Sequence, residues 1–256
     1  SRSIVMAGGA VAATCRELVP RLIKIGAHIL GEPEDAVRYE AGEVVGTTGR
    51  VSLAEIGHAW YLRPERLPPG VDLTGLEATQ GFKPKVDTGA FSYATHAAAV
   101  AVDTKTGHVD ILDYVIVEDC GRMINPMVVE GQTIGGTAQG IGTAFYEETL
   151  YDDNAQPLTS TLADYMLPGP TELPPLTIIH METPSPYTEF GAKGVGEGGA
   201  IAPPAALFNA VNDALGPIGA LVSETPLTPR RLLAAIEAAK TASHSKAEAE
   251  HAHEVI

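Results

Sequence analysis

Two glycine-rich runs place the strongest limits on how this chain can fold. The first, at residues 131–142, holds five glycines at a largely helical spacing, and the second, at 191–199, holds five within nine residues. Each glycine inside a helix costs about 1 kcal/mol relative to alanine, so such a helix indicates that another backbone or a ligand approaches it closely. We expect its glycine face to be buried against a second chain; close packing of two helices is the alternative that the spacing leaves open.

The second run encloses a single carboxylate, Glu197, directly before a predicted helix. Consecutive backbone N–H groups in such a turn form a concave anion-binding site, and the N-terminus of the following helix adds to it. A carboxylate packed among glycines and apolar residues is poorly solvated, which suits a general base that works near neutral pH. The residue order is not that of a phosphate-binding P-loop, and a flexible surface turn is the alternative interpretation.

Two further stretches are candidates for ligand contact. The amide of Gln132, in the first glycine-rich run, can donate and accept hydrogen bonds and so can bind the edge of a heterocycle. Its alternative role is that of a surface amide. Ser1, Arg2 and Ser3 precede an Ala/Gly-rich helix start, where the free N–H groups suit a phosphate or a cofactor edge.

The stretch 119–126 joins a predicted hairpin to the first glycine-rich run, and its expected role is structural. We expect Asp119 and Asn125 to bond nearby backbone groups and Arg122 to pair with a carboxylate. Cys120 has no evident histidine partner, so a nucleophilic role for it is not favoured.

Composition excludes several classes of protein. Of 256 residues, 45% are hydrophobic and 19% are charged, enough for a sizeable core in one large domain or two small ones. Acidic residues outnumber basic ones by 32 to 17, a net charge of −15, so neither nucleic acid nor an anionic membrane surface is an expected partner. No apolar run approaches the roughly 18 residues of a membrane span, and the start of the chain lacks both a signal-peptide layout and an initiator methionine. Two cysteines and eight histidines without metal-ligand spacing predict no metal bound by protein side chains.

The pattern of helices and strands predicts an α+β fold of mixed hairpins and helices, without strict βαβ alternation. We expect helices at 12–30, from Ser52 (a capping box with Glu55), from 125–126, at 202–215 and from 228 to about 240. We expect strands within 41–51, at 97–103 and 108–118 as a hairpin, and at 176–181. Residues 63–85 have no period and are expected to lie on another subunit, and the polar tail at 241–256 is expected to be disordered.

These stretches together resemble the molybdopterin-binding large subunit of the xanthine dehydrogenase/aldehyde oxidase family. The matching motifs occur in the family's order: Ser1-Arg2-Ser3, Asp119-Cys120-Gly121-Arg122-Met123-Ile124-Asn125-Pro126, Gly131-Gln132, Gly194-Val195-Gly196-Glu197 and Pro226-Leu227-Thr228-Pro229. The amino-acid sequence at 181–199 most resembles large subunits of the aerobic carbon monoxide dehydrogenase type. The resemblance extends to about Glu237 and covers only the C-terminal third of such a subunit, so we expect one molybdopterin-binding domain at 1–240, the C-terminal half of the molybdenum site.

The resemblance implies a role for particular residues. Glu197 matches the catalytic glutamate, which removes a proton from a molybdenum-bound hydroxide so that its oxygen attacks a carbon of the substrate. The remaining matches imply contact with the cofactor: Ser1, Arg2, Ser3, Gly131, Gln132, Lys193, Gly194, Val195 and Gly196. The metal would be held by the dithiolene of the pterin and not by this chain.

The resemblance also implies cofactors and partners. The cofactor would be molybdopterin cytosine dinucleotide carrying molybdenum, shared with a second molybdopterin-binding chain, while 2Fe-2S and FAD would lie on other subunits. The complete enzyme would be a cytoplasmic oxidoreductase that acts on an aldehyde, an N-heterocycle, a purine or carbon monoxide. The alternative is a non-catalytic structural half that only completes the fold of a partner chain; the retained Glu197 favours the first reading.

Overall fold

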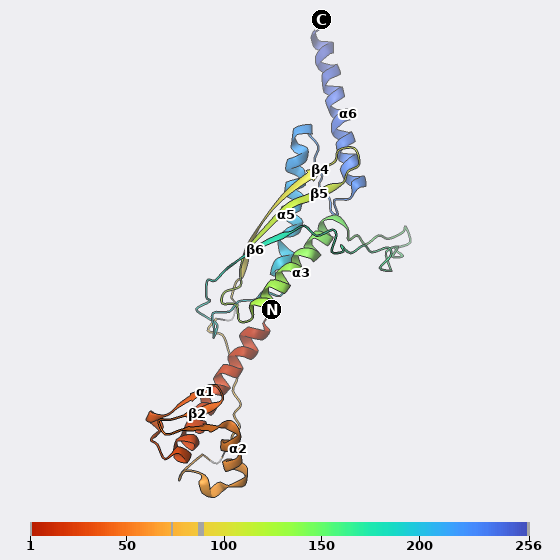
Figure 1. Ribbon diagram of the computed structural model, residues 1–256. Coiled ribbons are helices and arrows are strands. Elements are labelled where there is room, and N and C mark those ends of the chain that lie inside the picture. Colours follow the sequence, from red (N-terminus) through yellow and green to blue (C-terminus); the bar gives the residue numbers. More distant parts are fainter. Residues whose placement is uncertain (1, 73, 87–89, 255–256) are drawn as a thin grey trace. The chain divides into compact units, whose positions relative to one another are not determined.

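The computed structural model describes residues 2–72, 74–86 and 90–254 and divides them into two compact units (Figure 1). Among the described residues, unit 1 comprises 90–186 and 191–254, and unit 2 comprises 2–72, 74–86 and 187–190. None of the described helices combines the length and the apolar character that crossing a membrane requires.

Unit 2 is a small three-stranded sheet packed against two helices. Its elements are α1 (Ser3–Leu30), β1 (Arg38–Glu40), β2 (Glu43–Val45), β3 (Arg50–Ser52) and α2 (Leu53–Leu62), with short 3₁₀ turns at Glu34–Ala36 and Pro64–Arg66. The strands are antiparallel in the order β1-β2-β3. Ile25, Val44 and Ile56 are fully buried between them and form the centre of the core.

The capping box that the sequence predicts at the start of α2 is confirmed. The Ser52 hydroxyl accepts a hydrogen bond from the N–H of Glu55, and the Glu55 carboxylate accepts one from the N–H of Ser52, which completes the predicted capping box. The predicted start of the first helix at residue 12 is wrong, because the helix begins at Ser3. It also continues through Pro20, whose side chain is exposed, so the ring does not disturb the packed face.

The segment 63–85 packs against the core of unit 2 in the same chain. This corrects the expectation that it lies on another subunit. Its apolar side chains Leu67, Val71 and Leu76 pack against the core of unit 2. Farther along, the guanidinium of Arg21 on α1 donates to the carbonyl of Glu77 at 2.8 Å. The segment lacks a period because it follows α1 as an irregular strap.

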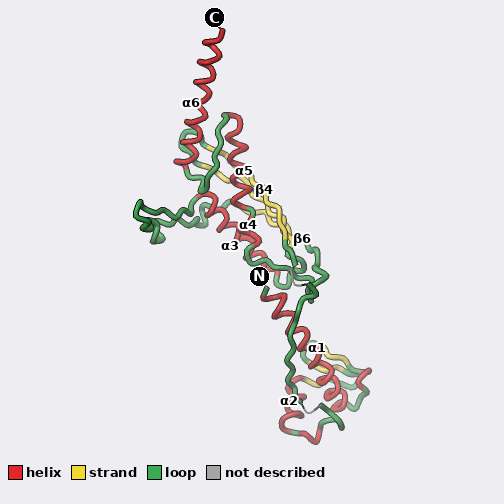
Figure 2. The backbone as a smooth tube through the Cα atoms, turned by 180° about the vertical axis from the view of Figure 1, so that it is seen from behind, coloured by secondary structure: helices red, strands yellow, loops and turns green. Residues whose placement is uncertain are grey.

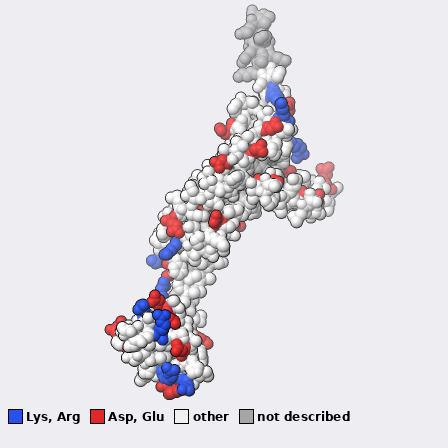
Figure 3. Space-filling view, in the orientation of Figure 1, with Lys and Arg blue, Asp and Glu red and all other residues white. Residues whose placement is uncertain are grey.

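Charged side chains of both signs gather on unit 2 in the face shown in Figure 3. Several of them form exposed ion pairs with N–O distances of 2.8 Å: Arg38–Glu40, Arg50–Glu43 and Arg63–Glu65. Such exposed pairs contribute little stability. Interspersed signs differ from the continuous basic surface that nucleic acid binding needs.

Unit 1 contains a second three-stranded sheet with helices on one face (Figure 2). The strands are β4 (Tyr93–Val102), β5 (Val109–Asp119) and β6 (Leu176–Met181); β4 and β5 form the predicted antiparallel hairpin, and β6 pairs parallel to β5. The helices are α3 (Pro126–Phe145), α4 (Gly198–Ile201), α5 (Pro203–Leu215) and α6 (Pro229–Glu254), with a 3₁₀ turn at Gly216–Ile218. This mixture of helices, a hairpin and one parallel strand confirms the predicted α+β class.

The core of unit 1 lies between the sheet and the helices α3 and α5. Tyr114 and Ile116 from β5 meet Ile141 from α3 and Leu207 from α5, and all four are fully buried. Burial alternates from one residue to the next along β4 and β6. Every second side chain of these strands therefore faces away from the helices. The helices therefore cover only one face of the sheet.

The structure differs from the expected disordered tail at 241–256. Helix α6 does not end near residue 240 but continues to Glu254. The added stretch is rich in alanine and glutamate, which are strong helix formers and need no hydrophobic period to favour a helix.

Candidate functional site

The two glycine-rich runs lie next to each other, joined by a side chain that the sequence singles out. Gln132, on the first part of α3, donates a hydrogen bond from Nε2 to the carbonyl of Gly196 at 2.8 Å. Five residues further along α3, the buried hydroxyl of Thr137 donates to the carbonyl of Gly199 at 3.4 Å. Helix α3 thus holds both ends of the segment that contains Glu197.

Close backbone approach explains part of the glycine content of α3. A Cβ added at Gly136 would lie 2.9 Å from the backbone nitrogen of Ala200, and one at Gly199 would lie 2.6 Å from the carbonyl oxygen of Thr133. At Gly140, an added Cβ would lie 2.7 Å from the ring of Pro203. The expectation that the glycine face needs a second chain is therefore wrong for this side of the helix, because its partner is the segment 198–203.

Three further glycines of the site border open space. A Cβ added at Gly131, Gly135 or Gly198 would meet no atom within 4 Å. Within the part of the chain that the structure describes, the backbone N–H groups of Gly194 and Val195 have no hydrogen-bond acceptor. A ligand can therefore approach this backbone closely and receive hydrogen bonds from it.

Glu197 is the residue that follows this pair of N–H groups and the Gly196 carbonyl. Its side chain is exposed, and it has no hydrogen-bond partner among the described residues. The expectation of a poorly solvated carboxylate is thus not met by this chain alone, because the glycines around it have no side chains to exclude water. A bound ligand or a neighbouring chain is needed to remove that water.

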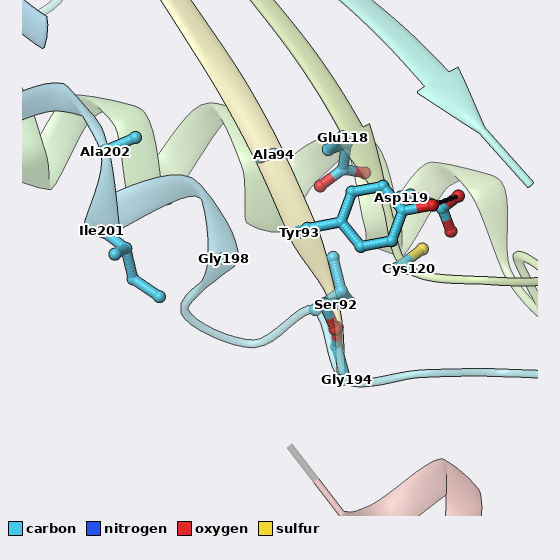
Figure 4. Close-up of a pocket in the computed structure, with 11 residues that line it drawn as sticks. Ser92, Tyr93, Ala94, Glu118, Asp119, Cys120, Gly194, Gly198, Ile201 and Ala202 are labelled. Carbon is cyan, nitrogen blue, oxygen red and sulfur yellow. Dashed lines mark hydrogen bonds between the residues drawn. The ribbon is translucent and has the colours of Figure 1, made fainter. Parts of the chain in front are cut away.

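Lys193, the first residue of the predicted cofactor-binding run, points away from open space. Its ammonium forms an ion pair with Asp119 at 3.0 Å, with the Lys193 and Asp119 side chains 7% and 0% exposed. Burial opposes the charge of Asp119, but hydrogen bonds from Thr183, Gly121 and Lys193 outweigh it and hold the pKa of this carboxyl well below its usual range. Figure 4 shows Asp119 beside the ring of Tyr93, whose hydroxyl donates to it at 3.0 Å.

A cavity of about 240 Å³ opens beside this ion pair, between the ends of β4 and β5 and the segment 194–202 (Figure 4). It is lined by Ser92, Tyr93, Ala94, Glu118, Asp119, Cys120, Gly194, Val195, Gly198, Ile201 and Ala202. Glu118 is buried, and its Oε1 atom lies at hydrogen-bond distance, 2.7 Å, from Nδ1 of His180. Burial and the charge of Glu118 raise the pKa of the Cys120 thiol, which disfavours a thiolate there.

The stretch 119–126 has the structural role expected of it in two of three particulars. Asp119 accepts a hydrogen bond from the N–H of Gly121 at 2.8 Å, and Asn125 caps α3 by accepting one from Val128 at 3.3 Å. Arg122, by contrast, is exposed and forms no ion pair with any described residue.

Two of the other predicted site residues belong to unit 2, which is described by itself. Arg2 and Ser3 belong to unit 2, where Arg2 is the N-cap of α1 and makes no side-chain capping bond. Ser1 lies outside the described residues. No group of three or more His, Cys, Asp or Glu side chains is arranged to hold a metal ion in the described parts of the chain.

Sequence reasoning missed Tyr93, Thr183 and the pairing of Asp119 with Lys193. The partners are 26, 64 and 74 residues from Asp119 in the sequence. The only signal was a lone aspartate at the end of a predicted strand and a lysine within a glycine-rich turn, and neither specifies the other.

The fold and the site define the class of protein: an α+β domain that presents exposed backbone and one free carboxylate to a ligand. A family model described as the molybdopterin cofactor-binding domain matches residues 1–174, and the chain belongs to this family. The resemblance to molybdenum hydroxylase large subunits is thereby confirmed.

Related proteins agree with this assignment. The chain is 40% identical over 240 residues to the nicotine 6-hydroxylase large subunit of Paenarthrobacter nicotinovorans, which covers 92% of this chain and 29% of that one. It is 32% identical over 235 residues to the carbon monoxide dehydrogenase large chain of Hydrogenophaga pseudoflava, covering 91% and 28%. The crystal structure of quinoline 2-oxidoreductase from Pseudomonas putida 86 matches with a TM-score of 0.81 at 38% identity, over 92% of this chain and 30% of that one. The chain thus spans less than a third of the length of these relatives.

Proposed function

We propose that this chain is part of a molybdenum hydroxylase, an oxidoreductase in which it binds one side of the cofactor and supplies Glu197 as the general base. The observation that carries the proposal is the hydrogen bond from Gln132 to the Gly196 carbonyl. It joins the two predicted cofactor-binding segments and leaves the carboxylate of the next residue, Glu197, exposed.

The residues present fit a molybdopterin cofactor. The open space beside Gly131 and Gly198 accommodates a group that approaches the backbone, and the N–H groups of Gly194 and Val195 provide donors for it. Gln132 retains its amide oxygen as an acceptor at the same place. When bound, the cofactor supplies the two-electron redox chemistry that no side chain of this site offers.

In this proposal the chain performs three tasks. The backbone of 194–196 orients the cofactor, Gln132 fixes the turn relative to α3, and Glu197 accepts a proton from the water-derived oxygen that is transferred to the substrate. Arg2 and Ser3, with Ser1, are proposed to contact the same cofactor from the start of α1. The finer form of the cofactor that we propose is molybdopterin cytosine dinucleotide.

The wider set of candidate substrates comprises aldehydes, N-heterocycles, purines and carbon monoxide. From this set we propose a nitrogen heterocycle. The relatives at 38–40% identity are named for nicotine and quinoline, both of which are nitrogen heterocycles, whereas those named for carbon monoxide dehydrogenase are 29–32% identical. Oxidation of a ring carbon would release two electrons, which leave through 2Fe-2S and FAD subunits of a cytoplasmic complex.

A second molybdopterin-binding polypeptide is the partner that we propose for unit 1. The sheet face opposite α3 and α5 presents apolar side chains to solvent, among them Leu112, Ile179 and Met181, which are 62%, 49% and 48% exposed. A sheet with apolar residues on both faces is normally covered on both. The part of the relatives that this chain does not match, more than two thirds of their length, is the occupant that we propose for this face.

The proposed function is tested by Glu197→Gln in the assembled complex. The substitution preserves volume but removes the proton acceptor, so molybdenum and cytidine nucleotide content should remain at the wild-type level. The rate at which a panel of N-heterocycles, aldehydes and carbon monoxide reduces the metal centre should fall roughly 10²–10⁴-fold. Glu237→Gln, at a carboxylate of α6 that is 67% exposed, is the matched control and should leave the rate unchanged.

A Glu197→Gln complex that keeps its cofactor and more than about a tenth of the wild-type rate lies outside the range for a positioned base. That result would favour the non-catalytic structural half. A wild-type complex that contains neither molybdenum nor cytidine nucleotide would overturn the proposal itself.

A further inference from the structure

The buried carboxylate of Asp119 gathers donors from four separate segments of unit 1. Its Oδ1 atom accepts hydrogen bonds from the N–H of Gly121 at 2.8 Å and from the Lys193 ammonium at 3.0 Å. Its Oδ2 atom accepts from the Tyr93 hydroxyl at 3.0 Å and from the N–H of Thr183 at 2.9 Å. Both oxygens are therefore fully used, which is what a buried charge requires.

The same region fixes the polypeptide on both sides of Lys193. The backbone N–H of Lys193 donates to the carbonyl of Cys120, just beyond β5, at 2.7 Å. The carbonyl of the next residue, Gly194, accepts a hydrogen bond from the hydroxyl of Ser92, just before β4. The chain therefore enters the turn 194–197 from a point that two strand ends hold in place.

The Lys193 side chain is fixed in direction as well. Its ammonium lies 4.7 Å from the centre of the Tyr93 ring, a cation–π distance, while it bonds Asp119. An ion pair of this kind is a weak source of stability, since well-packed apolar residues of the same volume often serve equally well. What it adds is a directional bond that defines where Lys193 lies along the end of the sheet.

We propose that Asp119 and Lys193 are positioning residues for the turn 194–197. The inference rests on the proposed function, because the groups that the turn presents are those assigned to the cofactor and the substrate. The pair sets the direction of the Gly194 and Val195 N–H groups and of Glu197. Lys193 therefore acts by anchoring the turn, and its ammonium is not a cofactor ligand.

The test compares three variants of the assembled complex. Lys193→Met keeps the length of the side chain over Tyr93 but leaves Asp119 without its cation. The double variant Asp119→Asn with Lys193→Met removes both charges and keeps an acceptor for neighbouring N–H groups. Arg231→Met is the matched control, because it breaks another ion pair of unit 1, to Glu148 at 2.6 Å, outside the turn.

Three measurements separate positioning from stability. They are the melting temperature, the molybdenum and cytidine nucleotide retained per complex after dialysis, and hydrogen–deuterium exchange in peptides that cover 194–200. Lys193→Met should lower cofactor retention and the reduction rate per molybdenum by about 10–100-fold, the range for residues that orient the ligands of a metal site. Exchange in the turn should become faster, while Arg231→Met should lower the melting temperature without either effect.

The double variant decides the matter if Lys193→Met fails to fold. It should recover much of the melting temperature, yet its cofactor retention should stay low and exchange in the turn fast. Wild-type retention and exchange in either Lys193 variant would assign the pair to stability alone and overturn the inference. A wild-type complex without molybdenum would instead overturn the proposed function, and with it the turn's role.

Discussion

Replacing Gly199 by alanine tests the packing on which the candidate site depends. The added Cβ would lie 2.6 Å from the carbonyl oxygen of Thr133 and 3.1 Å from its Cα, both backbone atoms of α3. Ordinary contact begins at 3.4 Å. The 2.6 Å separation must therefore lengthen to about 3.4 Å, which requires α4 to move away from α3. Overpacking of this kind costs about 1–3 kcal/mol.

Gly135→Ala is the matched control, with the opposite expected sign. Its Cβ would meet nothing within 4 Å, although it lies in the same helix. Alanine in a helix interior is more stable than glycine by roughly 0.5–1 kcal/mol. Gly199 packs directly on Thr133, and Gly135 lies close to Thr133 in the same helix. The two substitutions nevertheless have opposite expected effects on stability.

Thermal unfolding of the purified chain, followed by circular dichroism, measures both effects. At about 2–4 °C per kcal/mol for a domain of this size, Gly199→Ala should melt roughly 2–12 °C lower and Gly135→Ala about 1–4 °C higher. The single tryptophan, Trp60, packs in unit 2, so its fluorescence transition should not shift in either variant. An unchanged or raised transition in Gly199→Ala would refute the close approach of α3 and α4.

Two further predictions concern an acidic carboxyl and the open sheet face. Hydrogen bonds from the Thr48 side chain and from the backbone N–H groups of Thr47 and Thr48 lower the pKa of Glu32 from 4.5 to about 2. Because the folded-state pKa is depressed, its stabilisation is present above 4.5 and is lost as the pH falls toward 2. The urea midpoint of unit 2, followed by Trp60 fluorescence, should therefore be lower in Glu32→Gln near neutral pH and equal to wild type at the acidic end; a constant difference would contradict this. Ile179→Glu should weaken assembly with the partner polypeptide at least about tenfold, because a buried unpaired carboxylate is costly, whereas Leu162→Glu, at a side chain 79% exposed outside the sheet, should not alter sedimentation of the complex.

The elements that the sequence predicts well are those whose signals are local. The hairpin of β4 and β5, the strand β6 and the start of α3 at Asn125 all depend on alternation, turn residues or a cap within a few positions. The helix bounds at residues 3 and 254 were missed because alanine-rich stretches form helix without a hydrophobic period.

The contacts that create the site are of another kind. Asp119 and Lys193 are 74 residues apart, and Gln132 and Gly196 are 64 apart. Residue types at such separations carry no mutual signal in a single sequence, so the candidate residues could be named while their arrangement could not. Residue chemistry singled out Glu197 and Gln132, the resemblance to a family added the other candidates, and the structure shows which of them meet.

Four of the five glycines of α3 separate into two groups. Gly136 packs against the backbone of Gly199 and Ala200, and Gly140 packs against the ring of Pro203, so their helix-propensity cost of about 1 kcal/mol each is offset by close packing. Gly131 and Gly135 carry the same cost, and among the described residues no atom beyond their own helical turn would lie within 4 Å of an added Cβ. A local rule that is broken without a compensating contact marks a functional or an interface position. One side of α3 therefore packs on the segment that leads away from Glu197, and the other side leaves open space at Gly131 and Gly135, where we propose that the cofactor approaches.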